Sequence, residues 1–295
     1  MSDISFSKEC RTEAMENFKF SKKDCCNISF LKGYFYAEDI AENSDVFAFV
    51  TDIEKSLRSV KKLLSKYDIN CETAKTENSF GSVQDLLLFN GADTVSMLHN
   101  LLNNTGDSCQ LCRVNFLTGV FVSSATLSDP LKEYHLEFSL KDENKCDDLL
   151  KIFSSCGFEF KKTFRKQNFV VYTKNSRIIE DFLATVGAQN AFMSLVQSKV
   201  EKDVRNRINR QINCETANIA KTIKASRKYI LAVEKLKSGG LFDSLPDDLK
   251  ELAELKAENP DLPLSQLGKM CRPPLTKSTV NRKLNKLCTL AQIEE

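Results

Sequence analysis

The sequence predicts an α+β domain built from two copies of one pattern, followed by an all-α domain that contains a helix-turn-helix. Two related apolar stretches support the first part: ISFLKGYFYAEDIAE around Gly33 and VNFLTGVFVSSATLSD around Gly119, 86 residues further on. Each stretch precedes a strand-like alternation of apolar residues and then an amphipathic helix. The C-terminal tract PPLTKSTVNRKLNKLCTL supports the second part, because a proline break there leads directly into a basic amphipathic helix.

We place the first domain at residues 1–198 and its two copies at about 20–105 and 109–198. In the first copy, the glycine-containing helix is followed by a strand at 46–52 and a helix at 53–66. The second copy continues after its own glycine-containing helix with strand 134–142, helix 143–155, strands 158–164 and 168–174, and helix 176–187. This order indicates an α+β half that is repeated once, with pseudo-twofold symmetry.

The two glycines in these apolar helices predict a close helix–helix contact. A glycine inside a helix costs about 1 kcal/mol relative to alanine, so two glycines at matching places need a compensating reason. Close packing of two backbones at the pseudo-twofold axis supplies one, since Gly33 with Ala37 and Gly119 with Ser123 form stripes of small residues. The alternative is a pair of unrelated buried helices.

Residues 199–240 are predicted to form a helical linker. The segment from Lys202 to Leu236 contains neither glycine nor proline, and Gly239 and Gly240 end it. Its first part is rich in arginine, lysine and asparagine, which can contact phosphates and bases. Asparagine is a poor helix former, so its repeated use here favours such contacts or caps. We expect contacts to DNA from Arg205, Arg207 and Arg210. The alternative is a solvated helix that packs on the last domain.

Residues 241–295 are predicted to form the helix-turn-helix domain. Its first helix, at about 246–258, has Pro246 at the first helical position. The prolines at 273 and 274 end a short second helix near Cys271, and a third helix begins after Thr276, which can cap it. Each of these two helices has one apolar stripe, so the two should share a core. The stripes are Leu264, Leu267 and Met270 in the second helix and Val280, Leu284 and Leu287 in the third.

The face of the third helix opposite its apolar stripe carries residue types that read DNA. Arginine, asparagine and serine form hydrogen bonds with base edges in the major groove, and lysine and arginine contact phosphates. We expect base contacts from Ser278, Asn281, Arg282 and Asn285, with Lys277 on the same face. We expect phosphate contacts from Lys269, Arg272, Lys283 and Lys286. The alternative is an ordinary solvated helix in a small bundle.

Charge and hydropathy indicate which cellular location and which kinds of binding partner to expect. The chain has 42 basic and 40 acidic residues, but residues 1–198 carry a net charge of −4 and residues 199–295 a net charge of +6. The C-terminal part is therefore the one suited to a polyanion. No segment approaches an apolar membrane span, and the polar start MSDISFSKEC lacks the apolar run of a signal peptide. We expect a cytoplasmic protein with no membrane partner.

The eleven cysteines predict reduced thiols rather than a disulfide framework, because the chain is large and shows no export signal. One C-x-x-C pair is present, from Cys109 to Cys112, with no second such pair and no histidine near it. A structural zinc site would need cysteines from a distant part of the chain. We therefore predict no metal site, and we interpret Cys25 and Cys26 as small hydrophobic residues at a helix start.

Several tracts carry a resemblance to known families. LKGYFYAED at 31–39 and LTGVFVSSA at 117–125 resemble degenerate copies of the LAGLIDADG helix of homing endonucleases. Nearly the whole chain, in order, resembles the WhiA family. The tracts that follow the family pattern are FLKGYFYAED, FLTGVFVSSATLSDP, DFLATVGA, RNRINRQINCETANIAKT, LPDDLKELAELKAENPDLPLSQLG and PPLTKSTVNRKLNKL.

The resemblance implies a bacterial DNA-binding regulator linked to cell division and chromosome segregation, and to sporulation in some relatives. It implies double-stranded DNA as the partner, a nucleoid-associated location, contacts with other division or sporulation regulators, and neither cofactor nor small-molecule substrate. An alternative is a protein-interaction adaptor in division or segregation that binds DNA weakly.

The LAGLIDADG resemblance raises the question of nuclease activity. Such nucleases hold divalent metal between two acids, one near the end of each motif helix, and the metal activates water. Alignment on the motif glycines places Glu38 at the first acid position and Ser124 at the second. Because one ligand of the pair is missing, we predict that the protein is not an enzyme. A residual Mg²⁺-dependent nuclease is the remaining alternative.

Overall fold

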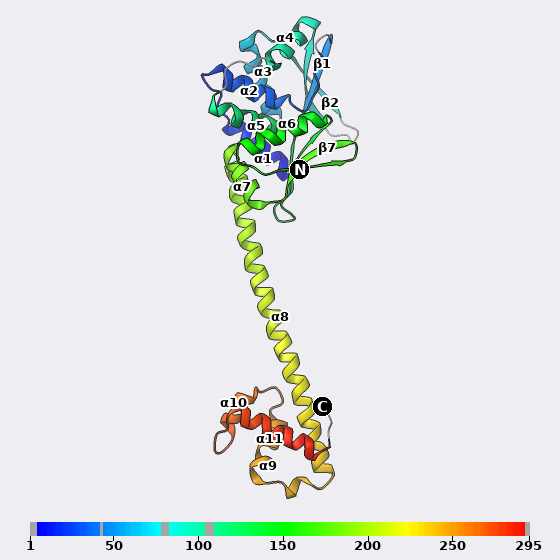
Figure 1. The fold of residues 1–295 in the computed structure, drawn as a ribbon, viewed down its shortest axis with the longest axis vertical. Coiled ribbons are helices and arrows are strands. Elements are labelled where there is room, and N and C mark those ends of the chain that lie inside the picture. Colours follow the sequence, from blue (N-terminus) through cyan, green and yellow to red (C-terminus); the bar gives the residue numbers. More distant parts are fainter. Residues whose placement is uncertain (1–4, 42–43, 78–82, 104–108, 293–295) are drawn as a thin grey trace. The chain divides into compact units, whose positions relative to one another are not determined.

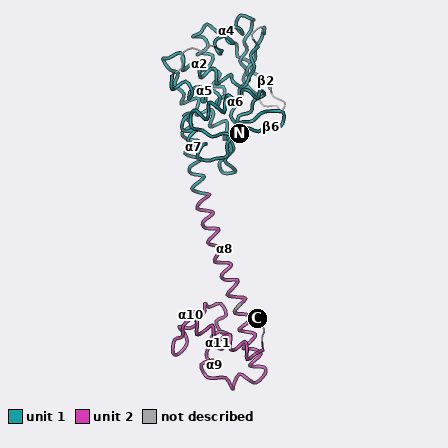
Figure 2. The backbone as a smooth tube through the Cα atoms, in the orientation of Figure 1, with its two compact units in different colours: residues 1–201 teal, residues 202–295 magenta. Residues whose placement is uncertain are grey.

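The computed structural model describes residues 5–41, 44–77, 83–103 and 109–292. The chain forms two compact units, Met1–Glu201 and Lys202–Glu295, which Figure 2 shows in different colours. Helix α8, Gln189–Ser238, contains the boundary between them (Figure 1). The predicted linker range of 199–240 lies within or just after this helix, and the last turns of α8 supply Tyr229, Ala232 and Leu236 to the core of the second unit.

The first unit contains the predicted α+β repeat, and Figure 1 labels its helices and some of its strands. After α1 (Phe6–Asn17), the first copy runs α2 (Asp24–Tyr34), β1 (Val46–Thr51), α3 (Glu54–Leu64), β2 (Glu72–Glu77), β3 (Val83–Asn90) and α4 (Ala92–Asn103), with a 3₁₀ turn at Ser65–Tyr67. The second copy runs α5 (Gln110–Ser124), β4 (Ala125–Leu127), β5 (Leu136–Leu140), α6 (Glu143–Ser155), β6 (Lys161–Arg165), β7 (Asn168–Thr173) and α7 (Ser176–Thr185).

Two antiparallel sheets repeat the same topology. The strand order is β1-β3-β2 in the first copy and β4-β5-β7-β6 in the second. The last three strands of the second sheet therefore match the first sheet, and β4 adds one strand at the edge. Apolar residues alternate along β5, so one face of the strand packs on the core. Leu136, Phe138 and Leu140 are buried, while Ser139 is exposed.

Helices α2 and α5 pack against each other through their glycines, as predicted. A Cβ atom on Gly33 would lie 1.9 Å from the carbonyl oxygen of Phe116, and one on Gly119 would lie 2.2 Å from that of Phe30. No larger residue fits either place, because the obstacle is backbone in both cases. The predicted stripe of Gly33 with Ala37 is wrong as a helical feature, since α2 ends at Tyr34.

The second unit is all-α. Its helices are the end of α8, then α9 (Asp247–Glu258), α10 (Leu264–Met270) and α11 (Lys277–Leu290), with a 3₁₀ turn at Phe242–Ser244. Two details differ from the sequence prediction. Pro246 is the N-cap of α9 rather than its first helical residue. Met270 is 45% exposed, because α10 ends there and turns its side chain away from the core that Leu267 enters.

Candidate nucleic-acid interface

The turn between α10 and α11 is held by a close backbone contact. The N–H of Leu275 donates to the carbonyl of Gly268 at 2.7 Å, and a Cβ on Gly268 would lie 2.3 Å from the carbonyl oxygen of Leu275. Thr276 caps α11, since its Oγ1 accepts a hydrogen bond from the N–H of Thr279. These contacts set the start of α11 against α10, which is the arrangement of a helix-turn-helix.

Helix α11 has one buried and one exposed face, as its sequence predicts. Val280, Leu284 and Leu287 are buried in the core of the second unit. The helix contains four basic residues and no acidic one. The side chains exposed on it include six of the predicted DNA-binding residues: Lys277, Ser278, Asn281, Arg282, Asn285 and Lys286. The exposed face of α11 is therefore positively charged and rich in hydrogen-bond donors.

The two asparagines of this face also connect α11 to α8. The hydroxyl of Tyr229 lies 3.1 Å from Oδ1 of Asn281 and 3.3 Å from Oδ1 of Asn285. Burial raises the pKa of Tyr229, so this hydroxyl keeps its proton and can donate. The single O–H proton is shared between the two amide oxygens, while each NH₂ group remains a donor for a base acceptor.

The basic residues differ in how their charge is used. The ammonium of Lys283 lies 2.5 Å from a carboxylate oxygen of Asp248, and the Lys283 side chain is only 18% exposed. The hydrogen bond from Lys283 lowers the pKa of Asp248. Lys283 is thus the predicted phosphate contact whose charge is already paired within the protein. Lys269 and Arg272 are exposed at the end of α10 and in the turn.

The arginines of α8 that are predicted to contact DNA lie far, measured along α8, from the place where α8 meets α11. Arg205, Arg207 and Arg210 are exposed. Arg210 precedes Tyr229, where α8 meets α11, by 19 residues, and so by about 29 Å of helix at 1.5 Å per residue. The structure therefore does not bring these arginines into the exposed face of α11.

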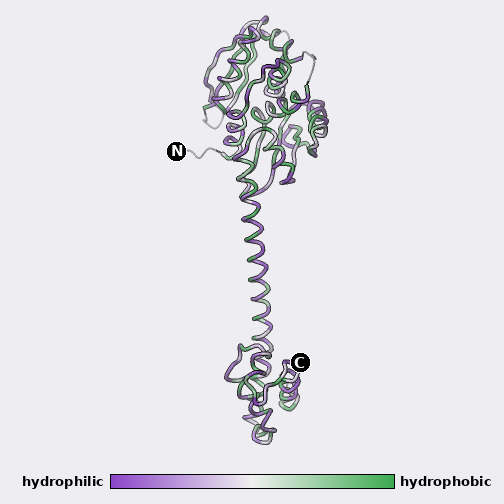
Figure 3. Tube along the Cα trace, turned by 90° about the vertical axis from the view of Figure 1, so that its left-hand side faces the viewer, coloured by the Kyte–Doolittle hydropathy of each residue, from purple (hydrophilic) through white to green (hydrophobic). Residues whose placement is uncertain are grey.

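An apolar stripe on α8 was not recognised in the sequence. Val204, Ile208, Ile212 and Ile219 are each at least half exposed, with exposed fractions of 51%, 51%, 52% and 60%. Figure 3 shows hydrophobic and hydrophilic residues interspersed along this helix. The spacing of four, four and seven residues is the signal in the sequence that indicates this stripe, although charged residues stand between its members.

The acid positions of the first unit do not form a carboxylate pair. Glu38 lies in a turn beyond the end of α2, and its carboxylate is 3.8 Å from the ammonium of Lys141. Ser124 is the last residue of α5, and its hydroxyl donates to the carbonyl of Val120 at 2.9 Å. The second position therefore holds a helix-bound hydroxyl in place of a metal ligand.

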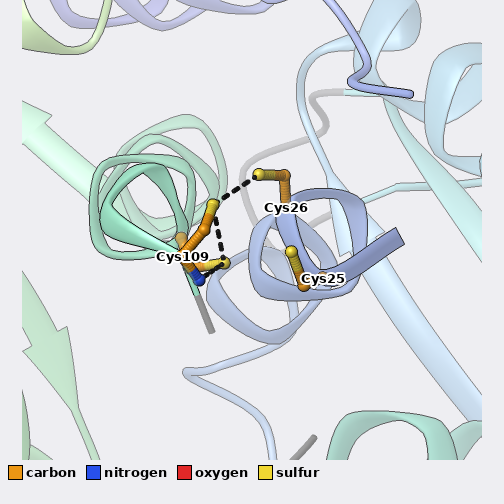
Figure 4. A group of neighbouring side chains, drawn as sticks. Cys25, Cys26 and Cys109 are labelled. Carbon is orange, nitrogen blue, oxygen red and sulfur yellow. Dashed lines mark hydrogen bonds between the residues drawn. The ribbon is translucent and has the colours of Figure 1, made fainter. Parts of the chain in front are cut away.

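The cysteines form the group most suited to a metal ion. Among the described residues, the only cluster of three or more potential metal ligands consists of Cys25, Cys26, Cys109 and Cys112 (Figure 4). A zinc site at Cys109 and Cys112 needs cysteines from a distant part of the chain. The packing of α2 against α5 supplies them, because it brings the adjacent pair Cys25 and Cys26 to Cys109 and Cys112.

The fold and the interface define a protein class: a degenerate LAGLIDADG-like domain followed by a C-terminal helix-turn-helix domain. Family models agree, since residues 113–205 match the WhiA LAGLIDADG-like domain and residues 208–291 match the WhiA C-terminal HTH domain. The chain is 32% identical to a probable cell division protein WhiA of Caldicellulosiruptor bescii, over 98% of this chain and 95% of that protein. It is also 32% identical to the protein of that name from Lachnoclostridium phytofermentans, over 98% of both chains.

The chain therefore belongs to the WhiA family. The crystal structure of full-length DUF199/WhiA from Thermotoga maritima has the same fold, with a TM-score of 0.63, 23% identity and 98% coverage of both chains. The crystal structure of a DUF199/WhiA N-terminal LAGLIDADG domain has a TM-score of 0.53 and 20% identity, covering 62% of this chain and 90% of that one. In the part of the chain that the structure describes, no helix is both long enough and apolar enough to span a membrane.

Proposed function

We propose that this chain is a non-catalytic DNA-binding protein that regulates genes or chromosome behaviour connected with cell division. The observation that carries the proposal is the exposed basic face of α11 in a helix-turn-helix. Relatives of this chain are named probable cell division proteins, which supports the biological setting. The proposed partner is double-stranded DNA, and the proposed location is the cytoplasmic nucleoid. Contacts with other division or sporulation regulators are part of the same proposal.

The chemistry of α11 suits a major groove. A helix N-terminus attracts phosphate through its unpaired N–H groups and its dipole, and Lys277 adds a charge in that first turn. One helical turn further on, Arg282 can make a bidentate contact with guanine, and the NH₂ groups of Asn281 and Asn285 can donate to base acceptors. Lys286, Lys269 and Arg272 then contact phosphates and fix the register of the protein on the duplex.

The absence of catalysis is proposed from the second acid position. Metal-assisted cleavage of a phosphodiester needs oxygen ligands that balance the charge of the metal and activate water. Glu38 is one such ligand, but Ser124 offers a neutral hydroxyl that is already bonded to the helix. A single carboxylate beside Lys141 binds Mg²⁺ weakly, so we expect neither nicking nor cleavage of DNA.

The test is to capture the DNA that the protein prefers. Purified full-length protein is incubated with sheared genomic DNA of its own host at moderate salt, and the retained fragments are sequenced. Recurrence of one motif upstream of particular genes supports a sequence-specific regulator. Even coverage of the genome supports chromosome binding without regulation of individual genes. Failure to retain DNA at low and moderate salt contradicts the proposal.

The exposed apolar stripe of α8 favours a second candidate function, a protein-interaction adaptor with weak DNA binding. Exposed apolar residues in a row along a helix are typical of a surface that binds another helix. Salt dependence separates the two functions. Several phosphate contacts lower DNA affinity by orders of magnitude as salt rises, whereas an apolar protein contact is retained or strengthened.

A further inference from the structure

Four cysteine thiols meet at one end of the α2–α5 helix pair. The sulfur atoms of Cys25, Cys26, Cys109 and Cys112 all lie within 4.8 Å of one another. Sγ of Cys26 is 3.3 Å from Sγ of Cys109, which in turn is 3.7 Å from Sγ of Cys112. Figure 4 shows Cys25 and Cys26 on one helix and Cys109 on its neighbour, with their sulfurs directed toward one another.

The repeat itself explains why the thiols meet. Cys26 lies seven residues before Gly33, and Cys112 lies seven residues before Gly119. Seven residues are about two helical turns, so each cysteine lies on the same helix face as the glycine that follows it. Both glycines face the partner helix at backbone contact distance. The two cysteines therefore occupy equivalent places in the two copies, and Cys25 and Cys109 complete the group from next to them.

The four thiols lie at the starts of two helices. Helix α2 begins at Asp24 and α5 at Gln110, so all four cysteines lie in or next to the first turn of a helix. Helix N-termini stabilise negative charge through the dipole and unpaired N–H groups. The N–H of Cys109 donates to Sγ of Cys112 at 3.3 Å. The helix starts and this hydrogen bond stabilise the thiolate form that a metal ion binds.

We propose that these four cysteines bind one zinc ion in a tetrahedral structural site. Four thiolates at about 2.3 Å from Zn²⁺ would have their sulfurs about 3.8 Å apart, close to the separations present here. An iron–sulfur cluster fits less well, since its four thiolates are divided among two or four irons and the sulfurs would stand further apart as a group. Four thiolates this close repel one another, and a divalent cation compensates that repulsion.

The site would clip together the two copies of the repeat. Its ligands come from the starts of α2 and α5, whereas Glu38 follows the other end of α2 and Ser124 is the last residue of α5. A zinc ion there would hold the starts of α2 and α5 together. The glycine contacts lie about two helical turns further along the same α2–α5 interface. The role of the zinc ion would be structural, because four protein ligands leave no open coordination position for substrate or water.

The test begins with the metal content of the full-length protein. The protein is produced without a histidine tag, since such a tag binds zinc itself, and is purified in reducing buffer after growth with added zinc. We expect one zinc per chain by elemental analysis. X-ray absorption should give four sulfur ligands at about 2.3 Å. Cys112→Ser should lower zinc affinity by more than about 100-fold, because losing a ligand exceeds the 10–100-fold effect of losing an outer hydrogen bond.

A matched control is Cys214→Ser, which removes an exposed cysteine of α8 that lies outside the cluster. It should retain one zinc per chain and the wild-type affinity. Because Cys112→Ser could fail to fold, a second measurement uses the unaltered protein. After the zinc is removed by a chelator, Co²⁺ should restore one metal per chain and give the ligand-field bands of tetrahedral thiolate coordination.

Four results would overturn the proposal. The first is folded wild-type protein that contains no zinc and gives no thiolate-bound Co²⁺ spectrum. The second is an iron–sulfur chromophore with matching iron and sulfide content. The third is a disulfide between Cys26 and Cys109 in protein purified under reducing conditions, detected by mass spectrometry. The fourth is equal zinc content in folded Cys112→Ser, folded Cys26→Ser and wild-type protein.

Discussion

Both units of this chain use glycine to let two backbone segments come into contact, but the two units carry opposite net charges. In the first unit, Gly33 and Gly119 let two helix backbones meet, and in the second unit Gly268 lets α10 meet the turn before α11. Residues 1–201 carry a net charge of −4 and residues 202–295 a net charge of +6. The first unit thus keeps the packing of a LAGLIDADG-like fold without its acid pair, while the basic surface that suits DNA belongs to the second.

The largest expected effect in this comparison is that of Gly119→Ala. The new Cβ would lie 2.2 Å from the carbonyl oxygen of Phe30 and 2.6 Å from the backbone nitrogen of Tyr34, so the helices must separate. We expect the free energy of unfolding of the first unit to fall by about 3 kcal/mol or more, at the upper end of overpacking effects. Chemical denaturation followed by circular dichroism measures it.

The control for this variant is Ser123→Ala on the same helix. It adds no atom and removes a half-buried hydroxyl that donates to Val120 within the helix, so we expect a change of less than about 0.5 kcal/mol. Equal stability of Gly119→Ala and Ser123→Ala would show that α2 and α5 can move apart at little cost. The first unit would then not depend on a glycine contact.

The corresponding change in the second unit is Gly268→Ala. Its Cβ would lie 2.3 Å from the carbonyl oxygen of Leu275, a half-buried residue in a turn whose other residues, 272–274, are exposed. Such a turn can shift more easily than a helix that is packed along its length. We expect a loss of about 2 kcal/mol in the stability of the second unit, together with weaker DNA binding. Hydrogen exchange of α10 and α11 measures the first effect, and fluorescence anisotropy with DNA measures the second. Full protection of both helices in the variant would contradict it.

Arg282→Ala and Lys286→Ala should separate the sequence-specific part of the DNA-binding free energy from the part that is the same for all sequences. We expect Arg282→Ala to cost about 1–3 kcal/mol on a preferred site and much less on random DNA, because arginine reads base edges. Lys286→Ala should weaken binding to both DNAs by a similar factor and reduce the salt dependence, because we assign Lys286 to a phosphate contact. Anisotropy titrations at several salt concentrations measure both variants.

The charge control for these variants is Lys62→Ala, which removes an exposed lysine from α3 of the first unit. It should leave affinity for both DNAs unchanged. Equal losses on preferred and random DNA for Arg282→Ala and Lys286→Ala would contradict the assignment of base and phosphate contacts. A loss for Lys62→Ala as large as theirs would mean that net charge, and not the α11 face, determines binding.

The sequence predicted the helices of the second unit well because each boundary has a local cause. Prolines at 273 and 274 end α10, Thr276 caps α11, and Gly239 and Gly240 follow the end of α8. The duplication of the first unit was predicted for the same kind of reason, since the two motif glycines and the alternating strands are visible within short windows.

The features that the sequence analysis missed depend on contacts between distant residues. The pairing of Lys283 with Asp248 depends on how α9 packs on α11, and no short window of sequence contains both. The cysteine cluster joins residues more than 80 positions apart. The sequence contains a signal for it, because Cys26 and Cys112 lie the same number of residues before the two motif glycines. An alignment of the two copies therefore places these two cysteines at equivalent positions.

A smaller effect is expected for Tyr229→Phe. Loss of the hydroxyl removes the one proton that it shares between Asn281 and Asn285, a hydrogen bond worth about 0.5–1.5 kcal/mol. Water can replace the hydroxyl at the exposed asparagines. We therefore expect the stability of the second unit to fall by about 1 kcal/mol and the preference for one DNA site over random DNA to weaken. Thermal unfolding and paired anisotropy titrations measure these changes. An unchanged preference would show that the asparagines do not depend on α8 for their orientation.

The smallest effect should be that of Glu38→Gln, and it tests the comparison most directly. If the first unit has kept the fold without the chemistry, replacing its remaining acid removes only a weak contact with Lys141 at 3.8 Å, which is worth less than about 1 kcal/mol in its half-exposed setting. Supercoiled DNA incubated with Mg²⁺ should stay intact with both wild type and variant. Nicking by wild type that disappears in Glu38→Gln would show that one carboxylate still supports catalysis, and the first unit would then contact DNA as an enzyme.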